Sequence, residues 1–467
     1  MLSFFRVNDP YRLIVIFFLL LIIRLPFLIS DVFLTIPEVL QLTIGSALDE
    51  GKVLYSELWT TYAPFSAGVY WFLDWAFGKS QLAHQIVSLL LVFIQAATLN
   101  GIFLENKAYN ENAYTPALVY IILLNIFFDF SSLSPVLMSM TLIIPSIGYI
   151  FQRVDKKTRD EIFLNTGVFL GIATLFHLTT GVFILSTILS LIIFSASLLR
   201  RYLLLLLGYV LPITLTWLYY LYNGAEFEFW KFFLFSPQSA DRELYLSLDL
   251  WIVMIVPFLF LLIGFYHVTL KGRYVNYQVR YLYVMFFGLC ASVFALLFEV
   301  RLSPHQLIIT APFITFFICH YFLLKRNSLG LEVIFTVFVT AVLVINYGTA
   351  FNDRTFKISE TKAKLISSTP EHSKSTQGKR ILLYGKSYSY YEQSTLASMY
   401  LQPDLSQVHF ENLDYYDNLS SIYSVLTNSK PEVIIDEIGS FEKIFDRLPL
   451  VALKYDKVKE GVYILKN

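Results

Sequence analysis

Apolar runs long enough to cross a lipid bilayer recur along almost the whole chain, and they restrict its fold more than any other feature. A spanning helix needs about 20 mainly apolar residues. This length predicts about eleven spans, give or take two because some runs are short, at 11–29, 84–104, 114–129, 134–151, 161–177, 180–198, 202–222, 249–269, 281–299, 306–324 and 330–348. Only 15% of the 467 residues are charged, against roughly a quarter in soluble proteins. We therefore expect an all-α polytopic membrane bundle.

The segment 65–78 is also apolar, but it is short and contains Asp74. Segments of this kind lie along a membrane more often than they cross it. If it crossed, the basic loop 152–160 would lie outside, against the excess of Lys and Arg that cytoplasmic loops carry. We therefore expect 65–78 to lie along the membrane. An odd number of spans after a cytoplasmic N-terminus then predicts an inner-membrane, multi-pass protein whose C-terminus is extracytoplasmic.

Hydropathy falls after Gly348, and a water-soluble pattern follows. We expect a membrane domain at 1–350 with an external loop at 30–80, a polar connector at 351–379 and a small α/β extracytoplasmic domain at 380–467. Within that domain the pattern predicts strands at 380–384, 432–436 and 461–465, and helices at 390–401 and 418–428. A glycine follows the first strand, but no phosphate-binding motif accompanies it. An accessory fold is therefore favoured over a phosphate site.

Several classes of protein are disfavoured. The net charge of +0 argues against nucleic acid as a partner. Cys290 and Cys319 both lie in apolar runs, which argues against a disulfide framework. No CxxC motif and no His/Glu spacing suggests a metal site. We expect no metal and no cofactor. His177, inside an apolar stretch, is interpreted as a core histidine with a satisfied hydrogen bond.

Two outside segments hold the candidate site residues. Glu38 follows Pro37 at the start of an apparent helix over 39–48 in the loop after the first span. A carboxylate suits a helix start, so Glu38 is either catalytic or a helix-start residue. The short turn from Glu299 to His305 holds three ionisable groups beside the membrane, where charges are costly and usually functional. Arg301 suits a phosphate, although a Glu299–Arg301 pair at the interface remains the structural alternative.

The layout resembles the GT-C superfamily of membrane glycosyltransferases, which includes protein mannosyltransferases and lipid A aminoarabinose transferases. The similar stretches are Pro37-Glu38, Asp49-Glu50-Gly51, Tyr62-Ala63-Pro64 and the late turn 301–305. The acidic pair of the family is reduced here to Pro37-Glu38. The family often has a second acidic residue after the third and fourth spans, and none is obvious here. The segment 130–135 at that place contains no acidic residue, and Asp129 lies just before it. A divergent bacterial member is the expectation.

The resemblance implies transfer of a sugar from a polyprenyl-phosphate donor to an acceptor at the outer face of the cytoplasmic membrane, in the cell envelope. Glu38 would be the general base. Arg301, His305 and Tyr62 would bind the lipid phosphate or substrate, and Arg301 would stabilise the leaving phosphate. The alternatives left open are a non-catalytic scaffold of an envelope assembly and, with less support, a transporter or flippase, which would show inverted repeats. Membrane lipids are the other expected partners.

Overall fold

The computed structural model describes residues 1–29, 34–155, 160–194, 198–235, 243–244, 248–270, 272, 274–299, 301–323, 329–351, 365–367 and 376–466. The chain divides into two compact units. The first comprises Met1–Val32, His84–Leu218 and Arg242–Lys364, and the second comprises Phe33–Ala83, Tyr219–Asp241 and Leu365–Asn467. Most of the predicted connector at 351–379 lies outside the described residues, and the predicted domain boundaries stay a prediction.

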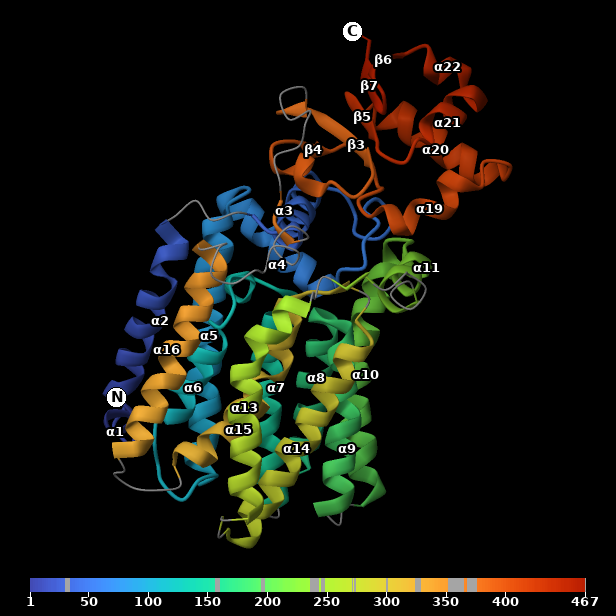
Figure 1. Cartoon of the computed structure of the whole chain (residues 1–467). Helices are drawn as coiled ribbons and strands as arrows, with labels where there is room; N and C mark the ends of the chain where they lie inside the picture. The colour runs from blue at the N-terminus through green and yellow to red at the C-terminus, as the bar shows by residue number, and fades with distance from the viewer. Residues whose placement is uncertain are drawn as a thin grey trace. The chain divides into compact units, whose positions relative to one another are not determined.

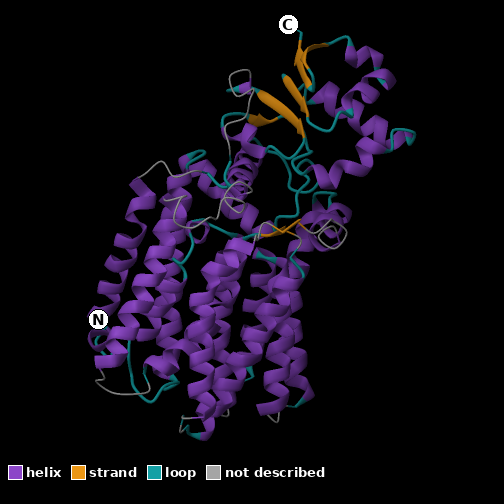
Figure 2. Ribbon diagram, in the orientation of Figure 1, coloured by secondary structure: helices purple, strands orange, loops and turns teal. Residues whose placement is uncertain are grey.

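The first unit is a bundle of helices that run side by side (Figures 1 and 2). Its helices are α1 (Leu2–Phe5), α2 (Tyr11–Ile29), α5 (Gln81–Glu105), α6 (Thr115–Leu123), η1 (Phe128–Ser131), α7 (Pro135–Asp155), α8 (Glu161–Phe176), η2 (Leu178–Val182), α9 (Phe183–Phe194), α10 (Leu199–Tyr222), α13 (Leu248–Leu270), α14 (Asn276–Leu297), η4 (Pro304–Thr310), α15 (Ala311–Phe322) and α16 (Leu329–Phe351). A short parallel pair of strands, β1 (Glu243–Leu244) and β2 (Arg301–Leu302), completes it.

Seven helices within the described residues are long and apolar enough to cross a membrane, and three shorter apolar helices accompany them. All eleven predicted runs contain helix, but the expectation of one continuous span over 114–129 is wrong. α6 has only nine residues, or about 14 Å of rise, against a hydrocarbon core of about 30 Å. The helix ends near Asn125, whose side-chain amide donates to the Ile121 carbonyl oxygen at 2.6 Å. The count of eleven spans stays a prediction.

Apolar side chains on the outside of the bundle explain why the composition is so hydrophobic. α2 buries Ile16, Leu20 and Phe27, yet Phe18 and Ile22 on its other side are more than half exposed. Water would not favour such a stripe, whereas lipid covers it without cost. This pattern is typical of a helix at the lipid-facing surface of a membrane bundle.

Glycines bring α8 and α10 into close contact. A Cβ added at Gly167 would lie 2.1 Å from the Leu205 carbonyl oxygen, and one at Gly208 would lie 2.3 Å from the Leu164 carbonyl oxygen. Small residues allow backbones to approach in this way, which is how helices associate where the hydrophobic effect cannot help. The two helices therefore pack backbone against backbone.

The second unit combines the loop after the first span with the C-terminal residues. Its elements are α3 (Ile36–Asp49), α4 (Pro64–Phe77), α11 (Glu226–Phe229), the π-helical turn η3 (Trp230–Phe235), β3 (Arg380–Tyr384), η5 (Tyr388–Glu392), β4 (Thr395–Leu396), α19 (Pro403–Glu411), α20 (Tyr416–Asn428), β5 (Val433–Asp436), α21 (Phe441–Arg447), α22 (Pro449–Ala452), β6 (Tyr455–Lys459) and β7 (Val462–Leu465). The strands form one sheet in the order β4-β3-β5-β7-β6, coloured orange in Figure 2.

The three predicted strands and the helix at 418–428 are confirmed. The helix predicted at 390–401 is wrong, because this stretch forms the end of η5 and the short strand β4. β4 pairs in parallel with β3, and that tertiary pairing outweighs the local helical pattern. β5 also runs parallel to β3, while β7 is antiparallel to β5.

The loop after the first span is hydrogen-bonded to the C-terminal residues within this unit. The Trp59 amide donates to the Met399 carbonyl oxygen at 2.8 Å, and the Lys79 ammonium donates to the Ser394 carbonyl oxygen at 2.9 Å. Lys52 donates to the Leu396 carbonyl oxygen. The loop and the C-terminal sheet therefore fold as one body.

The segment 65–78, which was predicted to lie along the membrane, forms helix α4. It packs Tyr70 and Leu73 inward, while Trp75 and Phe77 are each 66% exposed. Tryptophan and other aromatic side chains on an exposed helix face are typical of the membrane interface. The face thus agrees with a membrane-lying helix, and its orientation to a bilayer stays a prediction.

Candidate functional site

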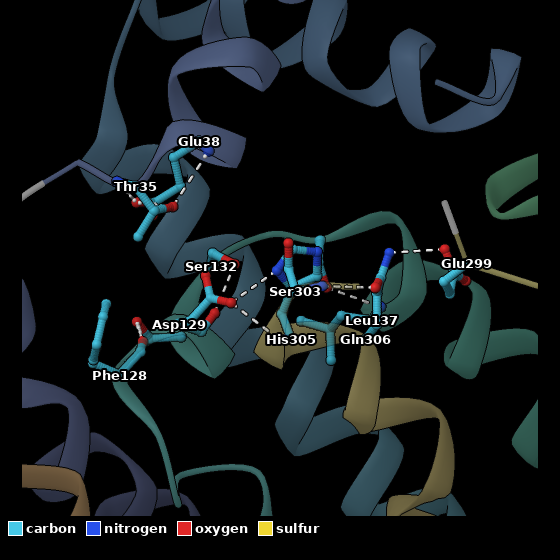
Figure 3. Close-up of polar contacts among 12 residues, drawn as sticks. Thr35, Glu38, Phe128, Asp129, Ser132, Leu137, Glu299, Ser303, His305 and Gln306 are labelled. Carbon is cyan, nitrogen blue, oxygen red and sulfur yellow. Dashed lines mark hydrogen bonds and ion pairs between the residues drawn. The ribbon is translucent and has the colours of Figure 1, made fainter. Parts of the chain in front are cut away.

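A buried aspartate and a buried histidine from distant parts of the sequence meet in the first unit (Figure 3). Asp129 lies in η1, in the break between α6 and α7, and is 1% exposed. His305 lies in the first turn of η4, which Ser303 and Gln306 cap reciprocally. The Asp129 Oδ2 atom accepts from the His305 backbone amide at 3.0 Å and lies 2.9 Å from its Nδ1. A protonated Nδ1 donating to the carboxylate satisfies this geometry.

The second oxygen of the same carboxylate is different. Asp129 Oδ1 is buried and has no hydrogen-bond partner among the residues that the structure describes. A buried polar atom left unpaired costs roughly 1–3 kcal/mol, so such an atom calls for an explanation, often a catalytic one. Oδ1 is therefore the oxygen of this carboxylate that remains available as a hydrogen-bond acceptor.

A second carboxylate, Glu299, follows the end of α14 and holds the neighbouring residue of η4. Its Oε1 lies 2.6 Å from His177 Nε2 and accepts from the Thr179 hydroxyl at 2.6 Å, while its Oε2 accepts from the Gln306 side-chain amide at 2.8 Å. Burial raises the pKa of Glu299, but the His177 and Thr179 contacts outweigh it and the pKa is lowered overall. Figure 3 shows the Gln306–Glu299 contact beside the Asp129–His305 pair.

These contacts show how η4 is fixed. His305 is held by Asp129 and its chain neighbour Gln306 by Glu299. Arg301 precedes them in β2, where its backbone is paired with that of Glu243. The Arg301 side chain lies outside the described residues, so its predicted role as a phosphate ligand remains untested. The described contacts of Glu299 are with His177, Thr179 and Gln306, and His177 has the satisfied hydrogen bond that was expected.

Glu38 and Tyr62 belong to the second unit. Glu38 is buried and completes a capping box at the start of α3, accepting from the Thr35 amide at 2.9 Å and from the Thr35 hydroxyl at 3.1 Å (Figure 3). The helix-start alternative is thus realised in the structure, and a catalytic role is not tested by it. Tyr62 is half-buried, and its carbonyl oxygen accepts from the Tyr55 hydroxyl at 2.8 Å.

No group of three or more His, Cys, Asp or Glu side chains that could hold a metal ion occurs among the described residues. The chemistry available at the Asp129–His305 pair is proton transfer and hydrogen bonding.

Sequence reasoning did not select Asp129 as a site residue. The pair is separated by 176 positions, so no local motif could reveal it. One signal was present, because Asp129 interrupts an aromatic and aliphatic run, and an ionisable residue in such a run is a functional candidate by default.

The helical bundle is that of a multi-pass membrane protein. With the break at η1, the capped turn η4 and the small sheet, its fold resembles that of the GT-C glycosyltransferases. In particular, two structures of ArnT from Cupriavidus metallidurans are similar to it. The structure bound to undecaprenyl phosphate has a TM-score of 0.56 and 12% sequence identity over 97% of this chain and 96% of that one. The apo structure has a TM-score of 0.54 and 13% identity over 97% of this chain and 95% of that one. No family model and no curated protein matches the chain.

Proposed function

We propose that the chain is a membrane glycosyltransferase that takes its sugar from a polyprenyl-phosphate carrier and transfers it at the outer face of the cytoplasmic membrane. The similarity to ArnT extends over nearly the full length of both chains, and one ArnT structure is bound to undecaprenyl phosphate. The observation that carries the proposal is the buried Asp129–His305 pair with one carboxylate oxygen unpaired. A carboxylate that is held through one oxygen and keeps the other unpaired can serve as a general base toward a hydroxyl group within hydrogen-bond reach.

In the proposed reaction Asp129 Oδ1 takes the proton of an acceptor hydroxyl. The acceptor oxygen attacks the anomeric carbon, the bond from that carbon to the phosphate oxygen breaks, and the lipid phosphate leaves with the electron pair. His305 keeps the carboxylate in place through Oδ2. Arg301 is proposed to stabilise the charge that grows on the phosphate, and Tyr62 to bind substrate.

Glu38 is the second candidate for the base. Its Oε2 already accepts two hydrogen bonds from Thr35, whereas Asp129 retains an oxygen without one. Asp129 also uses one oxygen, Oδ2, for two contacts with His305, and the difference is that its Oδ1 has no hydrogen-bond partner among the described residues. We therefore place Asp129 first.

The test compares Asp129→Asn with Glu38→Gln in the purified protein, supplied with undecaprenyl-phosphate sugars and a panel of envelope acceptors. General-base catalysis contributes about 10²–10⁴-fold, so Asp129→Asn should lower the transfer rate by that factor while undecaprenyl phosphate still binds. Glu299→Gln is the matched control, since it replaces a buried carboxylate that holds the same turn and whose two oxygens already have hydrogen-bond partners, and the proposal gives it no part in the proton transfer.

Each outcome decides a point. A normal rate in Asp129→Asn removes Asp129 from the mechanism, and loss of rate only in Glu38→Gln identifies Glu38 as the base. A wild-type protein that neither binds undecaprenyl phosphate nor releases it from a sugar donor would contradict the proposed function. No contact within the described residues specifically favours the scaffold or the transporter alternative.

A further inference from the structure

A buried arginine lies within the first long apolar helix. Arg24 of α2 is 2% exposed, and its position is five residues, or roughly 8 Å, from the last residue of that helix. Its guanidinium donates from Nε to Asn125 Oδ1 at 3.0 Å, from Nη1 to the Ser88 hydroxyl at 2.9 Å and from Nη2 to the Phe130 carbonyl oxygen at 3.2 Å. All three of these acceptors are neutral.

A cation in an apolar helix is costly, and such residues usually have a function. An arginine presents a rigid, planar fork of N–H donors, which suits it to fixing several acceptors at once. The acceptors here come from α5, from the turn after α6 and from η1. Arg24 therefore ties three elements together at one point.

Two of these contacts lead to the same short segment. Phe130, which Arg24 binds directly, follows Asp129 in η1. The Ser88 hydroxyl, the second acceptor, donates its own hydrogen bond to the Ser132 carbonyl oxygen at 3.3 Å. The carbonyl groups of Phe130, next to Asp129, and of Ser132, the residue that follows η1, thus accept from α2 and α5. The Asp129 carboxylate contacts His305.

We infer that Arg24 is a positioning residue that fixes η1 from the membrane-spanning helix α2 and thereby holds Asp129 against His305. Arg24 does not touch the reacting atoms in this inference, which rests on the proposed function only for its kinetic consequence. Its structural consequence is independent of any substrate: loosening Arg24 should loosen His305, because the described contacts connect the two residues through η1.

The primary test is hydrogen exchange in Arg24→Met, which is apolar, and in Arg24→Lys, which keeps the charge but not the fork. The His305 amide donates to Asp129, so its exchange should become about tenfold faster in Arg24→Met. Arg24→Lys should have an intermediate effect, because one ammonium cannot satisfy three separated acceptors. The lysine variant also serves if Arg24→Met does not fold.

Gln95→Leu is the matched control. Gln95 is a buried residue of α5 that also makes three side-chain hydrogen bonds, to the Leu137 carbonyl oxygen, Thr141 and Tyr120. None of them involves η1. Gln95→Leu should lower the thermal stability about as much as Arg24→Met does, and it should leave the exchange rate of the His305 amide near that of the wild type.

Equal exchange at His305 in wild type and in both Arg24 variants would overturn the inference, as would an equal acceleration in Gln95→Leu. If transfer is observed, Arg24→Lys should lower kcat at least tenfold with little change in KM for the donor. If the wild type transfers nothing, the proposed function fails, while the exchange experiment still decides whether Arg24 positions Asp129.

Discussion

Replacing Gly167 by alanine should separate α8 from α10. The added Cβ would lie 2.1 Å from the Leu205 carbonyl oxygen and 2.8 Å from the Tyr209 amide nitrogen. Ordinary contact begins at 3.4 Å, so the backbones must move apart by more than about 1 Å. A backbone oxygen cannot rotate away as a side chain can, and the whole interface has to open.

The magnitude follows from two opposing terms. Overpacking of a tight contact costs about 1–3 kcal/mol, while replacing glycine by alanine within a helix gains up to about 1 kcal/mol. Gly101 in α5 supplies the control, because nothing lies within 4 Å of a Cβ added there. Both variants gain the same helix propensity from alanine. The difference in the free energy of unfolding between Gly167→Ala and Gly101→Ala therefore measures the cost of the close contact alone, and it should be about 1–3 kcal/mol.

The assay is thermal unfolding of the purified protein in one detergent, with wild type and both variants side by side. Gly101→Ala should unfold at or above the wild-type temperature and Gly167→Ala below it. Because His177 directly follows the end of α8 and contacts Glu299, exchange at the amide of Gln306 should also rise in Gly167→Ala. Equal unfolding temperatures for the two variants would refute the close packing of α8 on α10.

Two further predictions concern the turn after α14 and the topology. Contacts lower the pKa of Glu299 below its ordinary 4.5, so the stability that this group contributes is present above pH 4.5 and is lost as the pH falls through the lowered pKa. The unfolding temperature should therefore drop less between pH 5 and pH 3 in Glu299→Gln than in the wild type. An equal drop in the two proteins would exclude this contribution. For topology, Asn428→Cys in a Cys290→Ser background should react in intact cells with a membrane-impermeant maleimide, and labelling only after the cells are broken would place the C-terminal residues in the cytoplasm.

Helices were predictable from the sequence where lipid dictates them. A span must be apolar over a fixed length, so the runs at 11–29 and 330–348 locate α2 and α16 within a few residues. The break after α6 was not predictable, since it depends on Asn125, whose oxygen binds Arg24 about a hundred positions earlier. A hydropathy window averages over such a residue and continues the helix.

The site shows the same limit. The pattern Thr35-x-x-Glu38 is visible in the sequence as a helix start, and the capping box appears as that pattern implies. The Asp129–His305 contact has no local pattern, because it is made by two breaks in helices that pack only in the folded chain. The strand β4 was not predicted for a similar reason. Its two residues are extended because they pair with the edge of β3, which is distant information for a local pattern.

The contact between Lys79 and the Ser394 and Tyr391 carbonyl groups joins residues more than 300 positions apart. At about 5–20 residues per second of synthesis, the loop that carries Lys79 exists for roughly 15 to 60 s before its partners are made. During that time its Trp59 amide lacks the Met399 acceptor, and the surfaces that later cover it are absent. The order of synthesis thus leaves residues 34–83 of the nascent chain accessible to proteases and chaperones during this interval. A ribosome that stops before residue 390 leaves this loop without the carbonyl groups that Lys79 and Trp59 bind in the complete protein.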